Sequence, residues 1–179
     1  KIAMAANNHQ NLVYVFGGSE PYYSTNGGSS WQKSSGAPSN ALSTTYMYQY
    51  DDPLISDRTA ANTFYLLDRQ GGNLYKSTDG GANWFVSSSD LPTSGNFSNL
   101  VAGWGSNNNL MAVSMGGNGL WLSTNGGSNF SKNGYFSNAR MVAIGIEKPG
   151  TSTPTLYVFG VHNGQWGVYR SNDFGRNWV

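Results

Sequence analysis

The side chains in this sequence best suited to acid–base chemistry are its nine carboxylates, since paired acids are a common arrangement for moving protons. Asp51 and Asp52 form the only adjacent pair. We favour a structural role for this pair over a functional one. Asp57 and Asp68 fall in expected turns, where a capping role is favoured. The others lie in loops, at strand ends or in a repeated motif: Glu20, Asp79, Asp90, Glu147 and Asp173.

Two of these acids belong to a loop that occurs four times with the pattern Ser-x-Asp/Asn-x-Gly-x-x-aromatic. The copies start about 50 residues apart, the spacing of propeller blades or similar arrays. Each follows a short apolar stretch, so each is predicted to be a hairpin turn. The pattern residues are Ser24, Asn26, Gly28 and Trp31; Ser77, Asp79, Gly81 and Trp84; Ser123, Asn125, Gly127 and Phe130; and Ser171, Asp173, Gly175 and Trp178.

The third position of this loop needs a hydrogen-bond acceptor and not an acid, because two of the four copies have Asn there. Glycine supplies the positive φ of a tight turn. Calcium prefers roughly six to eight oxygen ligands, and one acid per loop does not provide them. We therefore predict a structural loop with no metal and no cofactor. It resembles the Asp-box (BNR) repeat, which is found in β-propellers of several functions.

The composition supports an all-β chain. Only 11% of the 179 residues are charged, 14% are aromatic and 24 are glycine, as expected for many strands joined by tight turns. A net charge of +1 without a basic run implies neither nucleic acid nor an anionic membrane as partner. No apolar run approaches the length of a membrane-spanning helix. Without cysteine, disulfides are excluded.

Alternating apolar stretches around the repeats predict β-propeller blades of four antiparallel strands, about four blades of a presumed seven. We expect them at residues 1–35, 53–88, 99–134 and 140–179, the last one truncated after Trp178. An open stack of four blades would leave apolar faces uncovered. The sequence is therefore interpreted as part of a longer polypeptide.

The order of segments resembles the second, C-terminal propeller of family 74 glycoside hydrolases over essentially the whole chain. The resemblance rests on linked segments at residues 53–58, 62–65, 119–130, 143–150, 154–160 and 167–178. It implies a secreted two-propeller enzyme that cleaves the β-1,4-glucan backbone of xyloglucan with inversion, using one aspartate from each propeller. We find no segment that matches the catalytic aspartates, so we expect no catalytic residue and an inactive fragment.

A ligand is expected on the face that carries the second-to-third-strand turns and the blade-to-blade connections, since the Asp boxes occupy the other face. Aromatic rings beside amides could form a platform for the glucan that the resemblance implies. Tyrosines at alternate positions could equally mark one face of a strand, and the other tryptophans, Trp104 and Trp121 among them, are expected in the core. The candidate binding residues are Tyr46, Tyr48, Tyr50, Arg69, Tyr135, His162, Gln165 and Trp166.

The partners implied are a polysaccharide, xyloglucan or its oligosaccharides, and the remaining blades and second propeller of the parent chain. Asn96 and Asn129 lie in glycosylation sequons, compatible with an extracellular protein. The main alternative is a non-catalytic Asp-box propeller, such as a sortilin-like receptor domain or an assembly factor. A sialidase is disfavoured, because only two glutamates are present and the arginines flanking the last box occupy structural positions.

Overall fold

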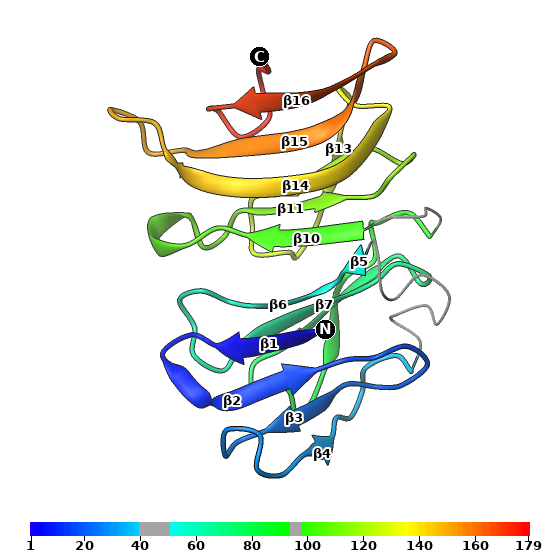
Figure 1. The fold of residues 1–179 in the computed structure, drawn as a ribbon, viewed down its shortest axis with the longest axis vertical. Helices are drawn as coiled ribbons and strands as arrows, with labels where there is room; N and C mark the ends of the chain where they lie inside the picture. The colour runs from blue at the N-terminus through cyan, green and yellow to red at the C-terminus, as the bar shows by residue number, and fades with distance from the viewer. Residues whose placement is uncertain (40–50, 94–97) are drawn as a thin grey trace.

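The computed structural model describes residues 1–39, 51–93 and 98–179, and the prediction of an all-β fold is confirmed for them (Figure 1). Four sheets follow one another along the chain. The first contains β1 (Ile2–Ala5), β2 (Asn8–Tyr14), β3 (Tyr22–Ser24) and β4 (Gln32–Lys33), and the second β6 (Leu54–Ser56), β7 (Phe64–Asp68), β8 (Asn73–Ser77) and β9 (Phe85–Ser88). The third contains β10 (Ser98–Ala102), β11 (Met111–Ser114), β12 (Leu120–Ser123) and β13 (Ser131–Asn133), and the fourth β14 (Asn138–Glu147), β15 (Pro154–His162) and β16 (Gln165–Ser171).

Two sheets depart from a plain four-stranded meander. The third gains β5 (Asp51–Asp52), which pairs parallel with β10 and was not predicted from the sequence. The fourth has three strands, although Val179 returns to β16 and exchanges two backbone hydrogen bonds with Arg170, of 2.8 and 2.9 Å. Among the described residues the sole helical turn is a 3₁₀ segment, η1 (Gly105–Asn107).

The sheets stack face to face, so every junction between them buries side chains from two sheets (Figure 1). The first strands β1, β6, β10 and β14 contact their counterparts in neighbouring sheets. We call the face of a sheet that packs on the preceding sheet its N-side face, and the opposite face its C-side face. Three cores fill the three junctions, centred on Val13 and Phe64, Leu74 and Met111, and Ala112 and Leu156.

The middle strands of the inner sheets are buried on both faces, because a neighbouring sheet covers each one. All five residues of β7 and all four residues of β11 are buried. Ser114 belongs to that set, and its hydroxyl donates to the Arg140 carbonyl of the next sheet at 3.2 Å. These strands therefore read as nearly continuous apolar runs instead of alternating ones.

Not every tryptophan lies in a core, which corrects part of the sequence interpretation. Trp84 and Trp178 are buried, at 5% and 9% exposure. Trp31 and Trp104 are only half-buried, whereas Trp121, also half-buried, packs against the core between the second and third sheets. Trp104 instead lies under the guanidinium of Arg58, whose Cζ is 4.9 Å from the ring centroid, so this indole carries a cation on its face. None of the described residues forms a helix long and apolar enough to cross a membrane.

Candidate functional site

The candidate residues that the structure describes lie at one side of the stack, where the β15–β16 hairpin and the connections between sheets are found (Figure 1). The Asp boxes and the turns between first and second strands occupy the other side. Tyr135 belongs to the connection between β13 and β14, and His162, Gln165 and Trp166 belong to the β15–β16 hairpin. Antiparallel pairing alone produces this sorting, because successive turns alternate between the two ends of a sheet.

Tyr135 and His162 form one unit of this side. Their rings stack with centroids 3.5 Å apart and an interplanar angle of 8°. His162 Nδ1 lies 2.7 Å from the Tyr135 carbonyl oxygen, so it must donate there, and Nε2 then accepts from the Asn163 amide at 2.9 Å. Both ring nitrogens are engaged within the protein. His162 is therefore arranged to hold the Tyr135 ring in place.

Trp166 takes part in a different cluster, on the C-side face of the last sheet. Its ring packs against Phe159 with centroids 5.1 Å apart, and Arg140 Cζ lies 5.0 Å from the indole centroid. The register pairs Trp166 with Val161 and Phe159 with Val168, so both aromatic rings lie on the same face of the sheet. Trp166 remains 49% exposed. An aromatic ring beside a guanidinium offers an apolar face and hydrogen-bond donors together.

The remaining candidates are less closely grouped. Gln165 pairs with His162 at the hairpin and is exposed, whereas Arg69 lies in the β7–β8 turn of the second sheet. Tyr46, Tyr48, Tyr50 and the sequon residue Asn96 lie outside the described residues. Asn129 is exposed within the third box. Sequence reasoning included Asn163 only as part of the turn at residues 162–166, and it missed Arg140 and Phe159. Alternation along β15 could have suggested which face Phe159 occupies.

The four boxes repeat one hydrogen-bond pattern. The box serine hydroxyl donates to the Asp or Asn side chain two residues on, at 2.8–2.9 Å, and accepts from the amide of the fifth residue, the box glycine. The Asp or Asn oxygen accepts the amide four residues further on, as Asp79 does from Asn83 at 2.9 Å. In the fourth box Phe174 stands where the others have glycine, with φ +54°. Such a conformation is costly for a side chain other than glycine.

Three aspartates have a lowered pKa, which keeps their carboxylates ionised. Burial would raise the pKa of Asp57, but amide donors from Ala60 and Thr59, the Thr59 hydroxyl and the Tyr65 phenol outweigh burial and lower it. The pKa of Asp79 is lowered in the same way by Asn83 and Ser77. Donation from the Asn177 amide is the main cause that lowers the pKa of Asp173 to about 2. An acid catalyst needs a raised pKa, so these three aspartates are unsuited to that role.

Comparison with known proteins supplies the family. A model of the BNR/Asp-box repeat matches residues 22–33. A xyloglucanase of Paenibacillus sp. is 33% identical over 175 residues, covering 94% of this chain and 16% of that protein. An oligoxyloglucan-reducing end-specific xyloglucanase of Emericella nidulans is 29% identical over 177 residues, covering 90% of this chain and 19% of its own length.

Solved structures of GH74 enzymes agree with this sequence similarity. The GH74 xyloglucanase of Xanthomonas campestris superposes with a TM-score of 0.77 at 22% identity, over 99% of this chain and 24% of that one. A GH74 enzyme of Niastella koreensis gives 0.64 at 25% identity, over 99% and 30%. These findings support a fragment of a family 74 glycoside hydrolase. The sheets are thus similar to the propeller blades of GH74 enzymes, and the matches do not favour the non-catalytic alternative. The chain spans less than a third of the length of the two xyloglucanases and the two GH74 structures named above.

Proposed function

We propose that this family 74 fragment is scaffold and glucan-binding surface of a secreted enzyme that hydrolyses the β-1,4-glucan backbone of xyloglucan with inversion. The 33% identity to the Paenibacillus xyloglucanase along 94% of the chain carries the proposal. The rest of that enzyme, including further blades and a second propeller, would supply the catalytic acid and base. The lowered pKa values of Asp57, Asp79 and Asp173 support a fragment without its own acid catalyst.

The glucan would contact the side of the stack that bears Tyr135 and Trp166. Tyr135 is held in place by His162, and Trp166 by Phe159 and Arg140, so each ring is positioned before a ligand arrives. Preorganised aromatic rings suit pyranose rings because they offer flat apolar area at little entropic cost. Gln165, Arg69 and the tyrosines at 46, 48 and 50 complete the proposed set.

The test uses the longer protein that contains these residues beside the 179-residue chain. With xyloglucan as substrate, the longer protein should release reducing sugar whose anomeric configuration is inverted, and the 179-residue chain should release none. Sugar release by the 179-residue chain would disprove its lack of catalytic residues. No release by the longer protein would disprove the xyloglucanase assignment.

Binding is tested separately by affinity electrophoresis of the chain in gels containing xyloglucan. Trp166→Ala and Tyr135→Ala should each weaken retardation several-fold, while Trp104→Ala, at the Asp-box side, serves as the matched aromatic control. Equal retardation of all three variants would contradict the proposed surface without affecting the enzyme assignment.

A further inference from the structure

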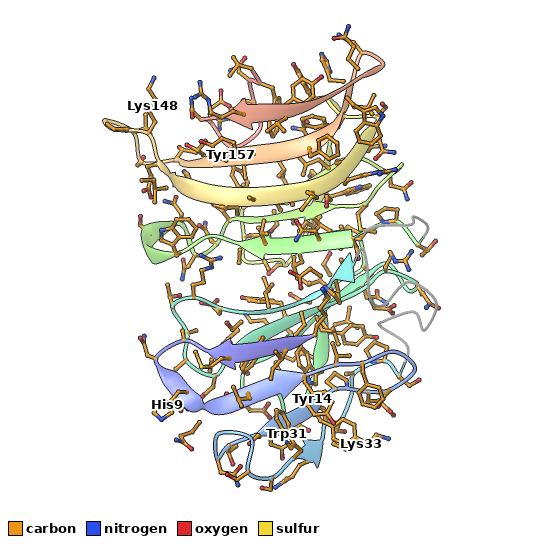
Figure 2. All side chains as sticks on the ribbon, in the orientation of Figure 1. His9, Tyr14, Trp31, Lys33, Lys148 and Tyr157 are labelled. Atoms are coloured by element: carbon orange, nitrogen blue, oxygen red, sulfur yellow. The ribbon has the colours of Figure 1, made fainter. Side chains whose placement is uncertain are left out.

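A polar hollow of about 450 Å³ lies between the third and fourth sheets, at the Asp-box side of the stack. The turns that join the first and second strands of these sheets, residues 103–110 and 148–153, form two of its walls, and the third and fourth boxes form the others. Figure 2 shows Lys148, on the second of these turns, at the same side of the stack as η1 in Figure 1. The hollow is thus opposite the glucan surface proposed above, and both sheets that enclose it belong to this chain.

Two residue differences between the sheets open this hollow. In the first sheet, Asn11 precedes the residue that pairs with the box serine, and its amide donates to the Gly80 carbonyl of the next box at 2.8 Å. The same position in the third sheet is Leu110, and Phe174 of the fourth box stands where the second box has Gly80. Two apolar residues that line the hollow therefore replace a hydrogen bond between sheets. Phe174 holds a costly φ of +54°, and such strained residues cluster at ligand sites.

The hollow also presents polar groups that the fold does not use. The Asn107 amide donates to Glu147 at 2.7 Å, which fixes the side chain and turns its carbonyl oxygen away from that bond. Within residues 1–39, 51–93 and 98–179, the hydroxyls of Ser152 and Thr153 and the guanidinium of Arg176 have no hydrogen-bond or ion-pair partner. Thr153 is nevertheless half-buried. The lining thus offers both donors and acceptors to a ligand.

The charges of the lining favour a neutral ligand. Asp173 is ionised, because the Asn177 amide and other donors lower its pKa to about 2, and Arg176 supplies a charge of opposite sign on the same wall. Asp173 Oδ1 already accepts three hydrogen bonds, and Oδ2 accepts one from the Asn177 side chain. These oxygens are therefore unsuited to a metal ion, which needs several of them free. The part of the chain that the structure describes holds no cluster of acids and histidines that could bind a metal.

From these features we propose that the hollow binds a pyranose unit of a xyloglucan chain, as a second glycan site at the Asp-box side. Phe174 and Leu110 supply the apolar contact that one face of a pyranose needs. Asn107, Thr153 and Arg176 supply hydrogen bonds to the hydroxyl groups around its edge. The volume of about 450 Å³ falls in the range of small-ligand pockets. The choice of xyloglucan rests on the proposed function, whereas the preference for a neutral sugar rests on the hollow alone.

Hydrogen exchange followed by mass spectrometry tests the proposal, because it locates a bound ligand without depending on hydrolysis. The longer protein that contains these residues is incubated with xyloglucan oligosaccharides at up to about 10 mM, above the dissociation constants of most weak sites. The amides of residues 103–110 and 148–153 should exchange several-fold more slowly than without the sugar. The second box, residues 77–84, lies outside the hollow and should be unchanged.

Two variants sharpen the test. Arg176→Ala removes charged donors and should weaken the apparent affinity about tenfold, the cost of one hydrogen bond to a charged group. Ser152→Trp fills the hollow from an exposed position and should abolish the protection. Arg170→Ala, at an exposed arginine of β16 outside the hollow, is the matched control and should bind like the parent protein. Circular dichroism checks folding, and Arg176→Gln replaces Arg176→Ala if that variant fails to fold.

Three results would contradict the second site: no protection of the two turns at the highest sugar concentration, protection unchanged in both variants, or protection by inorganic phosphate in place of the sugar. The last would indicate an anion site at Arg176. Release of reducing sugar from xyloglucan is measured on the same preparations and separates the two proposals. Release without protection of the turns would refute the second site alone, whereas no release would refute the xyloglucanase assignment.

Discussion

The inner junctions and the two open faces of this stack are built from the same residue positions, yet those positions differ sharply in exposure. Leu74 and Leu120 are fully buried, whereas Val168, at the same distance from its box serine, is 72% exposed. Trp84 is 5% exposed, whereas Trp31 of the first box is half-exposed. The repeat thus fixes which residues form a junction, and the neighbouring blade alone decides whether they are buried.

The comparison also shows that the Asp box makes contacts with the preceding blade in addition to the hydrogen bonds within its own turn. Each inner box places a glycine against the preceding blade and offers its carbonyl to a polar side chain there. Ser34 donates to Gly81 at 2.5 Å, Ser87 to Gly127 at 3.0 Å and Asn133 to Gly175 at 2.8 Å. The box therefore connects one blade to the next while it shapes its own turn.

One of the two largest expected effects comes from making the same glycine-to-alanine substitution in an inner box and in the box of the first sheet. Gly81→Ala should lower the free energy of unfolding by about 3 kcal/mol, since the methyl is strained at φ +94° and collides with Val13 Cγ2. Gly28→Ala, at φ +88° but with its nearest neighbour at 3.5 Å, should cost only the backbone strain of about 1–2 kcal/mol. Urea unfolding followed by tryptophan fluorescence measures both. Equal losses would mean that the junction does not constrain the box glycine.

A similar contrast is expected for side-chain truncation. Leu74→Ala should cost about 2–5 kcal/mol, because it opens a cavity between the second and third blades. Val168→Ala should change stability by at most about 0.5 kcal/mol, because its side chain is mostly in solvent. Denaturant midpoints provide the comparison. A large loss at Val168 would show that the C-side face is already covered within the isolated chain.

Much of this arrangement could be predicted from the sequence, because the boxes and the short apolar stretches carry local information. Glycine at a turn and an aromatic residue three positions later indicate a hairpin wherever they occur. The sequence could not distinguish Trp31 from Trp84, since both stand at the same box position and only one has a preceding blade. It also could not reveal β5, because Asp51 and Asp52 pair with Ser98 and Asn99 of β10, which follow the whole second sheet along the chain.

The candidate site was predictable in location and much less so in detail. Turn order placed Tyr135, His162 and Trp166 at one side of the stack. Which face Trp166 occupies depends on the register that pairs it with Val161, and a two-residue shift of the hairpin would change its neighbours. The role of His162 depends on Asn163, whose amide engages the second ring nitrogen. Such details arise from tertiary register and are not encoded in residue spacing.

A smaller effect should follow from removing one hydrogen bond between blades. Ser87→Ala deletes the donor to the Gly127 carbonyl and should cost about 1 kcal/mol. Ser89→Ala, an exposed serine two residues on, is the control and should be neutral. Thermal unfolding is sufficient to compare them. If Ser87→Ala proved as neutral as Ser89→Ala, the side-chain donor would not distinguish an inner junction from the open face.

The smallest expected effect is the response to acidic pH, which should differ between boxes that contain Asp and boxes that contain Asn. The pKa values of Asp79 and Asp173 are lowered in the folded chain, to about 2 for Asp173. Groups with a lowered folded pKa stabilise the fold above their unfolded pKa of roughly 4, and that contribution is lost as the pH falls toward the folded value. The boxes of Asn26 and Asn125 have no such group.

Between pH 4 and pH 2 the amides of Asn83 and Asn177, which donate to Asp79 and Asp173, should therefore lose hydrogen-exchange protection relative to those of Ser30 and Asn129. Asp173→Asn should abolish the loss at Asn177 alone, and a uniform loss at all four amides would instead indicate global unfolding.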